Sequence, residues 1–384
     1  MKKIVLTGGG TAGHVTPNLA LLPKLREMGY DISYIGSYDG IEKRLIADFD
    51  IPYYGVATGK FRRYIDPKNL SDPFRVIKGL AEAKKILKDL KPDVIFSKGG
   101  FVSVPIVRAA NSLKIPCIIH ESDLTPGLAN KLCIPVATKI CCNFPETYSL
   151  LPANKAVLTG SPIREELRKG NANEAKKICG FTEDKPTVMV IGGSQGAQAI
   201  NECVRASLPK LLDDFNIIHI CGKDKMDNML IGKKGYIQFE YVKSELKDFF
   251  ALCDLVVSRA GANAICELVA LKKPNLLIPL PITASRGDQI LNAESFEAQG
   301  FSMVIKEENM DEDSLTESIQ ALYCNRQSFI EAMNNSGQQD SINTICKLID
   351  EAADKHIAEK KIKEAKKNKK QNSDNKTENI PPEK

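Results

Sequence analysis

A glycine-rich loop that ends in a histidine is the first feature of the chain that could do chemistry. The stretch Gly8-Gly-Gly-Thr-Ala-Gly-His14 follows the apolar run Ile4–Leu6 and precedes a helical pattern from Pro17 to Met28. Glycines permit a tight turn and a close approach of the backbone to a ligand, and the start of a helix offers unpaired N–H groups to an anion. Histidine as a residue type titrates near physiological pH, so His14 is a candidate general base.

A Rossmann dinucleotide site is an alternative use of this loop. Such a site requires an acidic residue at the end of the second strand, about 20 residues beyond the glycines. The second strand here ends in Ile35-Gly-Ser, and Asp39 lies further along. The pattern therefore disfavours a dinucleotide, and we expect no cofactor.

A second glycine-rich loop, Ile191-Gly-Gly-Ser-Gln-Gly-Ala197, repeats the arrangement in the second half of the chain. Ser194 adds a hydroxyl donor to the backbone donors, a combination that suits a phosphate oxygen. The alternative for each loop is that its glycines serve only to pack a strand against its helix. The presence of one loop in each half favours a ligand that both halves share.

A third element follows an apolar run that ends at Val257. In Ser258-Arg-Ala-Gly-Ala-Asn-Ala-Ile-Cys-Glu267, the first turn of the predicted helix presents free N–H groups to a diphosphate. The carboxylate of Glu267 could accept both hydroxyls of a ribose, and the alternative is a solvated helix residue. Asp288 and Gln289, at a predicted helix start further on, could reach a sugar.

Both halves of the chain have the pattern of a parallel α/β sheet, in which short apolar runs alternate with helical segments. The runs predicted as strands are Ile4–Leu6, Ile32–Ile35, Val94–Phe96 and Cys117–Ile119, then Val188–Ile191, Ile217–Ile220, Leu255–Val257 and Leu276–Ile278. Ligands of such sheets bind beyond the carboxyl ends of the strands. We therefore predict an α/β protein of two Rossmann-like domains whose loops face a common cleft.

The stretch Thr159–Ile163 combines glycine and proline and is predicted to link the domains. The predicted division is an N-terminal domain of residues 1–160, a C-terminal domain of residues 161–352 and a Lys-rich tail of residues 353–384. The tail has too few apolar residues to fold independently and is expected to be solvated, partly helical and then disordered. A basic arm that touches an anionic membrane is the alternative.

Composition excludes several classes of protein. The 384 residues are 43% apolar, and no stretch approaches the ~18 apolar residues of a membrane span. The eleven cysteines lack a metal-ligand spacing and are expected to be buried cytosolic thiols. A net charge of only +5 gives little support to a nucleic-acid partner. The triplets Asp48–Asp50 and Asp311–Asp313 lie outside the loops and are expected to be surface carboxylates, so we predict no bound metal.

Residues 73–90 form a predicted helix with an apolar stripe and a basic remainder. The apolar stripe consists of Phe74, Ile77, Leu80 and Ala81. The basic residues are Arg75, Lys78, Lys84, Lys85 and Lys88. Such a helix can lie on an anionic membrane, and Phe61-Arg-Arg-Tyr64 upstream adds groups that suit an interface. The alternative is that the stripe faces the protein core. We favour peripheral membrane contact.

Four motifs together resemble one enzyme family. They are GGGTAGH at 8–14, HESDLTPGLANK at 120–131, GGSQGA at 192–197 and SRAGANAICELVA at 258–270. In this order and spacing they are similar to the MurG family, the UDP-N-acetylglucosamine:lipid-linked muramoyl-pentapeptide N-acetylglucosaminyltransferases. The resemblance spans residues 1 to about 350. It implies a B-type glycosyltransferase fold that binds UDP-N-acetylglucosamine mainly with the C-terminal domain and the undecaprenyl-diphosphate-linked acceptor with the N-terminal one.

The resemblance also implies roles for individual residues. The sugar and diphosphate side of the donor would contact Thr11, Ala12 and Gly13. Phosphate would contact Arg164 and Ser194, uracil would lie near Val242, and sugar hydroxyls would bind Gln289. The nucleotide would be held by Ala262, Asn263, Ala264, Ile265, Cys266 and Glu267, with Glu267 on the ribose.

Two positions depart from the commoner family pattern. Ala12 stands where glycine is usual, which is tolerable if the backbone φ there is negative. Asp123 stands where many members have asparagine, so the amide contact to the sugar does not carry over, and a contact from Asp123 is a hypothesis.

The implied reaction sets the chemistry. Transfer from an α-linked UDP-sugar to a β-linked product inverts the anomeric centre, and a single displacement needs a general base but no enzyme nucleophile. His14 is the predicted base and Glu121 its rival. Helix N-termini, Arg164 and Ser194 would stabilise the leaving diphosphate in place of a metal.

Three other functions stay open at this stage. They are transfer to a diacylglycerol or sterol acceptor, which the segment His120–Asn130 argues against, epimerisation of UDP-N-acetylglucosamine, and binding of that nucleotide without chemistry. The expected location is the cytoplasmic face of the cell membrane, as a peripheral protein.

Overall fold

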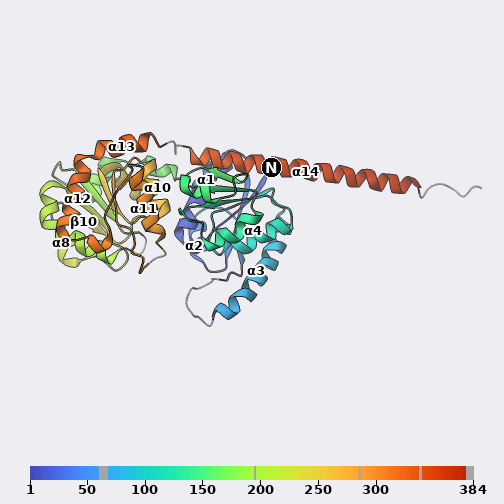
Figure 1. The fold of residues 1–384 in the computed structure, drawn as a ribbon, viewed down its shortest axis with the longest axis horizontal. Coiled ribbons are helices and arrows are strands. Elements are labelled where there is room, and N and C mark those ends of the chain that lie inside the picture. The colour runs from blue at the N-terminus through green and yellow to red at the C-terminus, as the bar shows by residue number, and fades with distance from the viewer. Residues whose placement is uncertain (60–67, 194–195, 285–286, 337–339, 378–384) are drawn as a thin grey trace, which may run out of the picture.

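The structure is a computed structural model that describes residues 1–59, 68–193, 196–284, 287–336 and 340–377, without the side chains of residues 68–74 and 367–377. Two domains lie side by side, and each has one parallel sheet (Figure 1). Across the described residues, no helix is both long and apolar enough to cross a membrane.

The first domain contains a seven-stranded sheet in the order β3-β2-β1-β4-β5-β6-β7. Its strands are β1 Lys3–Thr7, β2 Asp31–Ser37, β3 Tyr53–Val56, β4 Val94–Ser97, β5 Cys117–Glu121, β6 Lys139–Cys142 and β7 Ala156–Leu158. The helices between them are η1 Ala12–His14, α1 Thr16–Glu27, α2 Ile41–Ile46, α3 Lys68–Leu90, α4 Ser103–Ser112, α5 Leu128–Cys133, η2 Ile134–Val136 and α6 Pro145–Leu150. Because helices cover both faces of the sheet, the middle residues of its central strands are apolar, and polar residues follow at the carboxyl ends.

The second domain has a six-stranded sheet in the order β10-β9-β8-β11-β12-β13. Its strands are β8 Thr187–Ile191, β9 Asn216–Ile220, β10 Tyr236–Phe239, β11 Leu255–Ser258, β12 Asn275–Leu277 and β13 Met303–Val304. Its helices are η3 Glu165–Arg168, α7 Ala172–Cys179, α8 Gln198–Asp214, η4 Asn228–Leu230, α9 Leu246–Leu252, α10 Ala262–Ala270, α11 Asp288–Ala298, η5 Glu307–Asn309, α12 Glu312–Cys324 and α13 Arg326–Asn334.

The last helix, α14 Ser341–Thr377, returns to the first domain and lies along it (Figure 1). Ile345, Ile349 and Ala353 are buried in the core that α1 shares with the sheet, and Lys2 Nζ lies 2.7 Å from Asp350 Oδ1. This differs from the predicted division, which assigned residues up to 352 to the second domain. The apolar residues recur at helical spacing and so form a stripe that the first domain buries.

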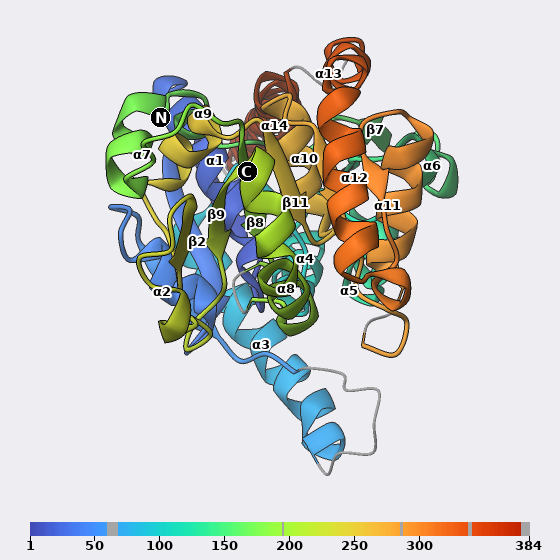
Figure 2. The ribbon, with the colours of Figure 1, turned by 90° about the vertical axis from the view of Figure 1, so that its left-hand side faces the viewer.

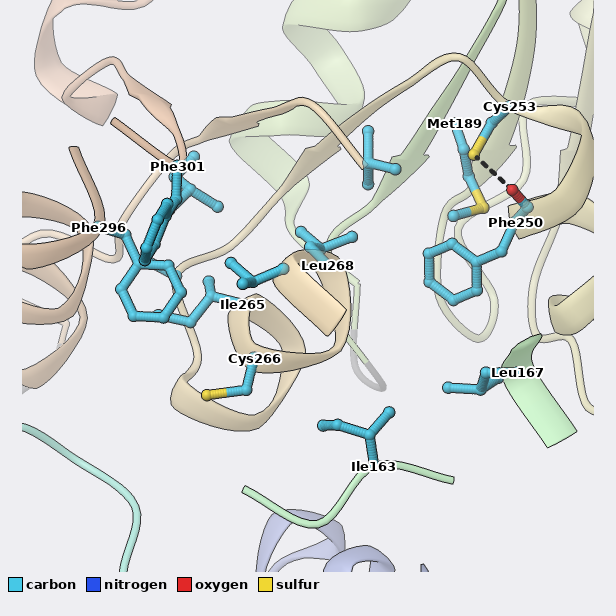
Figure 3. Packing of buried hydrophobic residues seen from close by; sticks show 14 of the residues in the cluster. Ile163, Leu167, Met189, Phe250, Cys253, Ile265, Cys266, Leu268, Phe296 and Phe301 are labelled. Carbon is cyan, nitrogen blue, oxygen red and sulfur yellow. Dashed lines mark hydrogen bonds between the residues drawn. The ribbon is translucent and has the colours of Figure 1, made fainter. Parts of the chain in front are cut away.

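The hydrophobic core of the second domain extends to the boundary between the domains (Figure 3). Ile265 of α10 lies beside Phe296 and Phe301, and the linker residue Ile163 lies on the other side of the helix. Phe144 of the first domain packs edge-on against Phe296, with ring centroids 5.5 Å apart. The start of α10 is therefore held by packing from the core and from the linker.

Candidate active site

The loop after β1 has a backbone that only glycine can supply at its first position. Gly8 has a φ of +154°, and a Cβ there would lie 2.4 Å from the carbonyl oxygen of His14. Ala12 is not among the described non-glycine residues with positive φ, so its methyl group is compatible with the loop. The glycines therefore fold the chain back so that His14 lies beside its own loop.

The side chain of His14 is partly buried at the end of this loop. Its Nδ1 lies 3.0 Å from Thr11 Oγ1. When Nδ1 carries the proton and donates it to that hydroxyl, Nε2 keeps the lone pair that a general base needs. The geometry thus gives the predicted base an orienting partner within its own loop.

The loop after β1 contacts the start of α10 in the other domain. Asn263 Nδ2 donates to the carbonyl oxygen of Gly13 at 2.9 Å, and Ser161 Oγ donates to Asn263 Oδ1 at 3.2 Å. A Cβ at Gly13 would lie 2.9 Å from Asn263 Nδ2. Asn263 therefore joins the first-domain loop, the linker and the second domain in one place.

The first turn of α10 offers its backbone rather than most of its side chains. Ala262, Ile265 and Cys266 are buried, whereas Ala264 is exposed. Gly261 precedes the helix without a side-chain cap, so the first N–H groups have no capping side chain. Among the six residues predicted to hold the nucleotide, Asn263 and Glu267 are the polar ones.

Glu267 and Arg164 form an ion pair at the edge of this turn. Arg164 Nη2 lies 3.4 Å from Glu267 Oε1, and Arg164 Nη1 lies 3.6 Å from Glu166 Oε1. Burial raises the pKa of Glu267, and the Arg164 guanidinium opposes this shift. Arg164 Nε is buried without a hydrogen-bond partner. The pair thus contains one donor without a partner among the described residues, Arg164 Nε, and one carboxylate, Glu267. Arg164 is the residue predicted to contact phosphate, and Glu267 the one predicted to bind the ribose.

Glu121, at the end of β5, has both oxygens occupied. Its Oε1 accepts from the backbone N–H groups of Ser122 at 2.8 Å and Asp123 at 3.1 Å. Its Oε2 accepts from Gly127 N at 3.0 Å and Asn130 Nδ2 at 2.8 Å. Burial raises its pKa, and the nearby Asp123 adds to the rise. These contacts favour a carboxylate that orders the following loop over one that takes a proton from a substrate.

Asp123 lies at the boundary with α11. Asn292 Nδ2 is 3.4 Å from Asp123 Oδ1, and the backbone N–H of Leu124 donates to Asn292 Oδ1 at 3.2 Å. Asn292 is buried and was missed by the sequence reasoning, although it lies one turn after Gln289. It bridges the two domains, since its Nδ2 also lies 3.3 Å from the carbonyl oxygen of Ala260, just before α10.

A buried lysine was also missed. Lys98 directly follows β4, is 1% exposed, and donates through Nζ to His120 Nδ1 at 2.7 Å and to Ser122 Oγ at 2.6 Å. Burial lowers its pKa to about 8. Burial and the Lys98 charge lower the pKa of His120, so its neutral ring donates from Nε2 to the carbonyl oxygen of Gly160 at 2.9 Å. The signal was Ser97-Lys-Gly-Gly100, another glycine pair that follows a strand.

The remaining predicted residues are dispersed. Gln289 is the second residue of α11, and its Oε1 accepts from Leu280 N at 3.1 Å. Val242 is partly buried in the loop after β10 and packs against the second-domain core. Ser194 lies outside the described residues, as do Phe61 to Tyr64. The phosphate contact predicted for Ser194 stays a prediction.

No cluster of metal-ligating side chains occurs within the described ranges. Asp48 and Asp50 are exposed, and Asp311 caps α12 by accepting from Ser314 N at 2.8 Å. Asp313 pairs with Lys210. Each of these carboxylates thus has a surface position or a local structural contact.

Two facing parallel-sheet domains, with glycine-rich loops after their first strands, define a glycosyltransferase of the B-type fold. Residues 4–142 match the glycosyltransferase family 28 N-terminal domain, and residues 187–379 match its C-terminal domain. A UDP-N-acetylglucosamine--N-acetylmuramyl-(pentapeptide) pyrophosphoryl-undecaprenol N-acetylglucosamine transferase of Lachnospira eligens is 62% identical over 349 residues, which are 91% of this chain and 99% of the relative. The protein of the same name from Lachnoclostridium phytofermentans is 60% identical over 351 residues, again 91% and 99% of the two chains. The chain therefore belongs to this family of transferases within glycosyltransferase family 28.

Solved structures agree with this assignment. MurG of Acinetobacter baumannii is 28% identical, with a TM-score of 0.72 and coverage of 91% of this chain and 100% of that one. A UDP-GlcNAc 2-epimerase from Methanocaldococcus jannaschii has a TM-score of 0.63 at 14% identity, covers 91% of this chain and 99% of its own, and shares the fold alone. The predicted fold class and the predicted family are confirmed.

Proposed function

We propose that the protein transfers N-acetylglucosamine from UDP-N-acetylglucosamine to an undecaprenyl-diphosphate-linked N-acetylmuramoyl-pentapeptide, with inversion at the anomeric carbon, in peptidoglycan synthesis. The observation that carries this proposal is the 62% identity to a transferase of that name over 99% of its length. The contact between Gly13 and Asn263 supports it, because it brings the base-bearing loop to the helix start that would hold the donor.

On the donor side, the second domain supplies the groups that a UDP-sugar needs. The uncapped first turn of α10 would receive the diphosphate, and the helix dipole would stabilise its charge as the bond to the sugar breaks. Arg164 would exchange its contact with Glu267 for phosphate, which frees Glu267 for the ribose hydroxyls. Gln289 would meet the sugar hydroxyls.

On the acceptor side, His14 would take the proton of the attacking hydroxyl. Thr11 holds the ring, and the oxygen then displaces the diphosphate from the opposite face of the sugar. The charge on the leaving group would be met by fixed protein dipoles and Arg164, so this route needs no enzyme nucleophile.

The test is the release of UDP from UDP-N-acetylglucosamine by the purified protein, with and without a short-chain lipid-diphosphate muramoyl-pentapeptide. Acceptor-dependent release with a new β-linked disaccharide is expected. Acceptor-independent conversion of the free UDP-sugar would indicate the epimerase, and tight binding without release would indicate a binding protein. Either result would overturn the proposal.

Glu267→Ala should raise the donor KM by at least about 10- to 100-fold with little change in kcat, because the loss of even one of two hydrogen bonds from the ribose hydroxyls to a carboxylate costs roughly 1.5–3 kcal/mol. Glu166→Ala is the matched control, since Glu166 also pairs with Arg164 but is largely exposed. Steady-state kinetics with varied donor measure the effect. An unchanged donor KM in Glu267→Ala would show that Glu267 does not bind the ribose.

We further propose peripheral contact with the cytoplasmic face of the membrane through α3. Ile77 is 64% exposed and Leu80 37% exposed, whereas Ala83 and Leu87 on the same helix are buried. The core alternative is therefore wrong for Ile77 and Leu80, because a different stripe of α3 packs on the sheet. The part of α3 nearest its N-terminus stands away from the body of the domain (Figure 2).

The charge on α3 suits an anionic surface. The basic residues of α3 whose side chains the structure describes are exposed: Arg75, Lys78, Lys84, Lys85 and Lys88. Each basic residue near such a surface contributes about 1 kcal/mol, and exposed apolar side chains add insertion into the interface. The side chain of Phe74 lies outside the described ones.

The double variant Ile77→Ser with Leu80→Ser should bind anionic vesicles about 10- to 100-fold more weakly. Full burial of one such apolar side chain contributes roughly 1.5–3 kcal/mol, and insertion into the membrane interface buries each of the two only in part. Vesicle co-sedimentation measures this, and circular dichroism checks the fold. The double variant Met229→Ser with Ile231→Ser is the control, since both residues are exposed, at 94% and 65%, on the second domain. Equal binding by the two double variants would contradict the proposal.

A further inference from the structure

Glu42, on the short helix α2, is a fully buried carboxylate that the reaction described above does not use. Its Oε2 accepts from the backbone N–H of Gly10 at 3.1 Å. Its Oε1 accepts from the backbone N–H of Ser37 at 2.9 Å and also from the Ser37 hydroxyl. Among the described residues, no lysine or arginine forms an ion pair with it. A buried charge of this kind persists only when hydrogen bonds satisfy it, so these contacts define its position.

Three glycines make the space that the Glu42 side chain fills. A Cβ at Gly9 would lie 2.5 Å from Glu42 Cδ, one at Gly36 would lie 2.8 Å from Glu42 Cγ, and one at Gly40 would lie 2.2 Å from Glu42 Oε1. These glycines come from the loop after β1, from β2 and from the residue before α2. Any larger residue at these positions would displace the carboxylate from the Gly10 amide.

The position of the carboxylate changes what the first loop can bind. In a Rossmann domain, the space between the loop after the first strand and the end of the second strand receives a nucleotide ribose. Here the Glu42 side chain occupies that space and takes the N–H of Gly10. A phosphate placed on the same N–H would meet a negative charge, so the inner side of this loop is closed to nucleotide phosphate.

We propose that Glu42 is a positioning residue, which acts through the Gly10 N–H to fix the loop that presents Thr11 and His14. Gly10 directly precedes Thr11, and Thr11 contacts the His14 ring at 3.0 Å. Gly10 is exposed, has a φ of +86°, and has open space where a Cβ would point, so packing does not hold it. The Glu42 contact is then what restrains it. The inference rests on the proposed function, because it assigns His14 to the transfer step.

The Glu42→Gln variant should keep the hydrogen bonds from Ser37 and lose the one from Gly10. The amide oxygen can continue to accept from Ser37, but its NH₂ group would then face the N–H of Gly10, donor against donor. We expect kcat to fall about 10- to 100-fold, as for a catalytic group displaced by ~1 Å. We expect the affinity for UDP to be nearly unchanged, because the second domain would hold most of the nucleotide, whereas the loop with Thr11 would meet the donor on its sugar side. A purely structural role would lower the melting temperature without this split between kcat and UDP affinity.

Asp93→Asn is the matched control, since Asp93 Oδ2 accepts from the backbone N–H of Lys3 at 3.0 Å, at the opposite end of β1. Its kcat should equal that of the wild type. Gly10→Ala provides a second variant should Glu42→Gln not fold, because its methyl group enters open space and strains only the positive φ. It should lower kcat in the same way.

The assay uses the full chain with UDP-N-acetylglucosamine and the short-chain lipid-diphosphate acceptor. An inactive wild type would contradict the proposed function. An active wild type with normal kcat in both Glu42→Gln and Gly10→Ala would overturn the positioning role alone. A lower kcat in either folded variant, with nearly unchanged UDP affinity, supports it.

Discussion

His14→Ala should lower kcat by about 10²- to 10⁴-fold, the usual contribution of a general base, while the affinity for UDP is unchanged. The expectation follows from the position of His14, which lies at the end of a loop that contacts the donor domain through Gly13 and Asn263. Single-turnover kinetics with both substrates measure the chemical step, and calorimetry with UDP measures binding.

His356→Ala controls for the loss of a histidine in the first domain, since His356 lies on α14 and is only partly buried. Its kcat should match that of the wild type. A His14→Ala variant with nearly normal kcat would remove His14 as the base and transfer the role to Glu121, the rival that the sequence suggested.

Glu121→Ala should lower the free energy of unfolding by at least about 3 kcal/mol, because it leaves four donors without their acceptor at a cost of roughly 1–3 kcal/mol for each that stays buried and unpaired. The four donors belong to the segment from Ser122 to Asn130. Urea unfolding followed by circular dichroism measures the loss. The variant should therefore lose activity through disorder of this loop.

Glu121→Gln distinguishes this structural role from the role of a base. If Glu121 has a structural role, its conversion to the amide should lower the free energy of unfolding, because the NH₂ group opposes backbone N–H donors. If Glu121 is the general base, the variant should have a lower kcat and a normal free energy of unfolding. Glu174→Gln is the control, since Glu174 is an exposed residue of α7 that pairs only with Lys177 in the described part of the chain. Normal stability of Glu121→Gln would contradict the structural role.

The sequence by itself determined the inner strands of both sheets, the glycine-rich loops and the family, but it did not indicate the outer strands β3, β6, β7, β10 and β13. Central strands of a parallel sheet are buried on both faces, so they read as short apolar runs, and the loops that follow them must lie at one edge of the sheet. The runs predicted at Ile4–Leu6 and Leu255–Val257 lie within β1 and β11 for this reason. The position of the glycine-rich loop after β1 was therefore predictable from local pattern alone, and its role as a ligand site stays a prediction.

Only the tertiary structure decided which side chains support those loops. Lys98, Glu42 and Asn292 are polar residues that read as ordinary loop or helix positions, and they matter because folding brings them against distant partners. The same reason explains α14, whose apolar stripe has no partner in the sequence around it, and α3, where packing buries Leu87 and leaves Ile77 exposed. Local periodicity identifies an apolar face, but contacts between residues far apart in the chain determine what covers it.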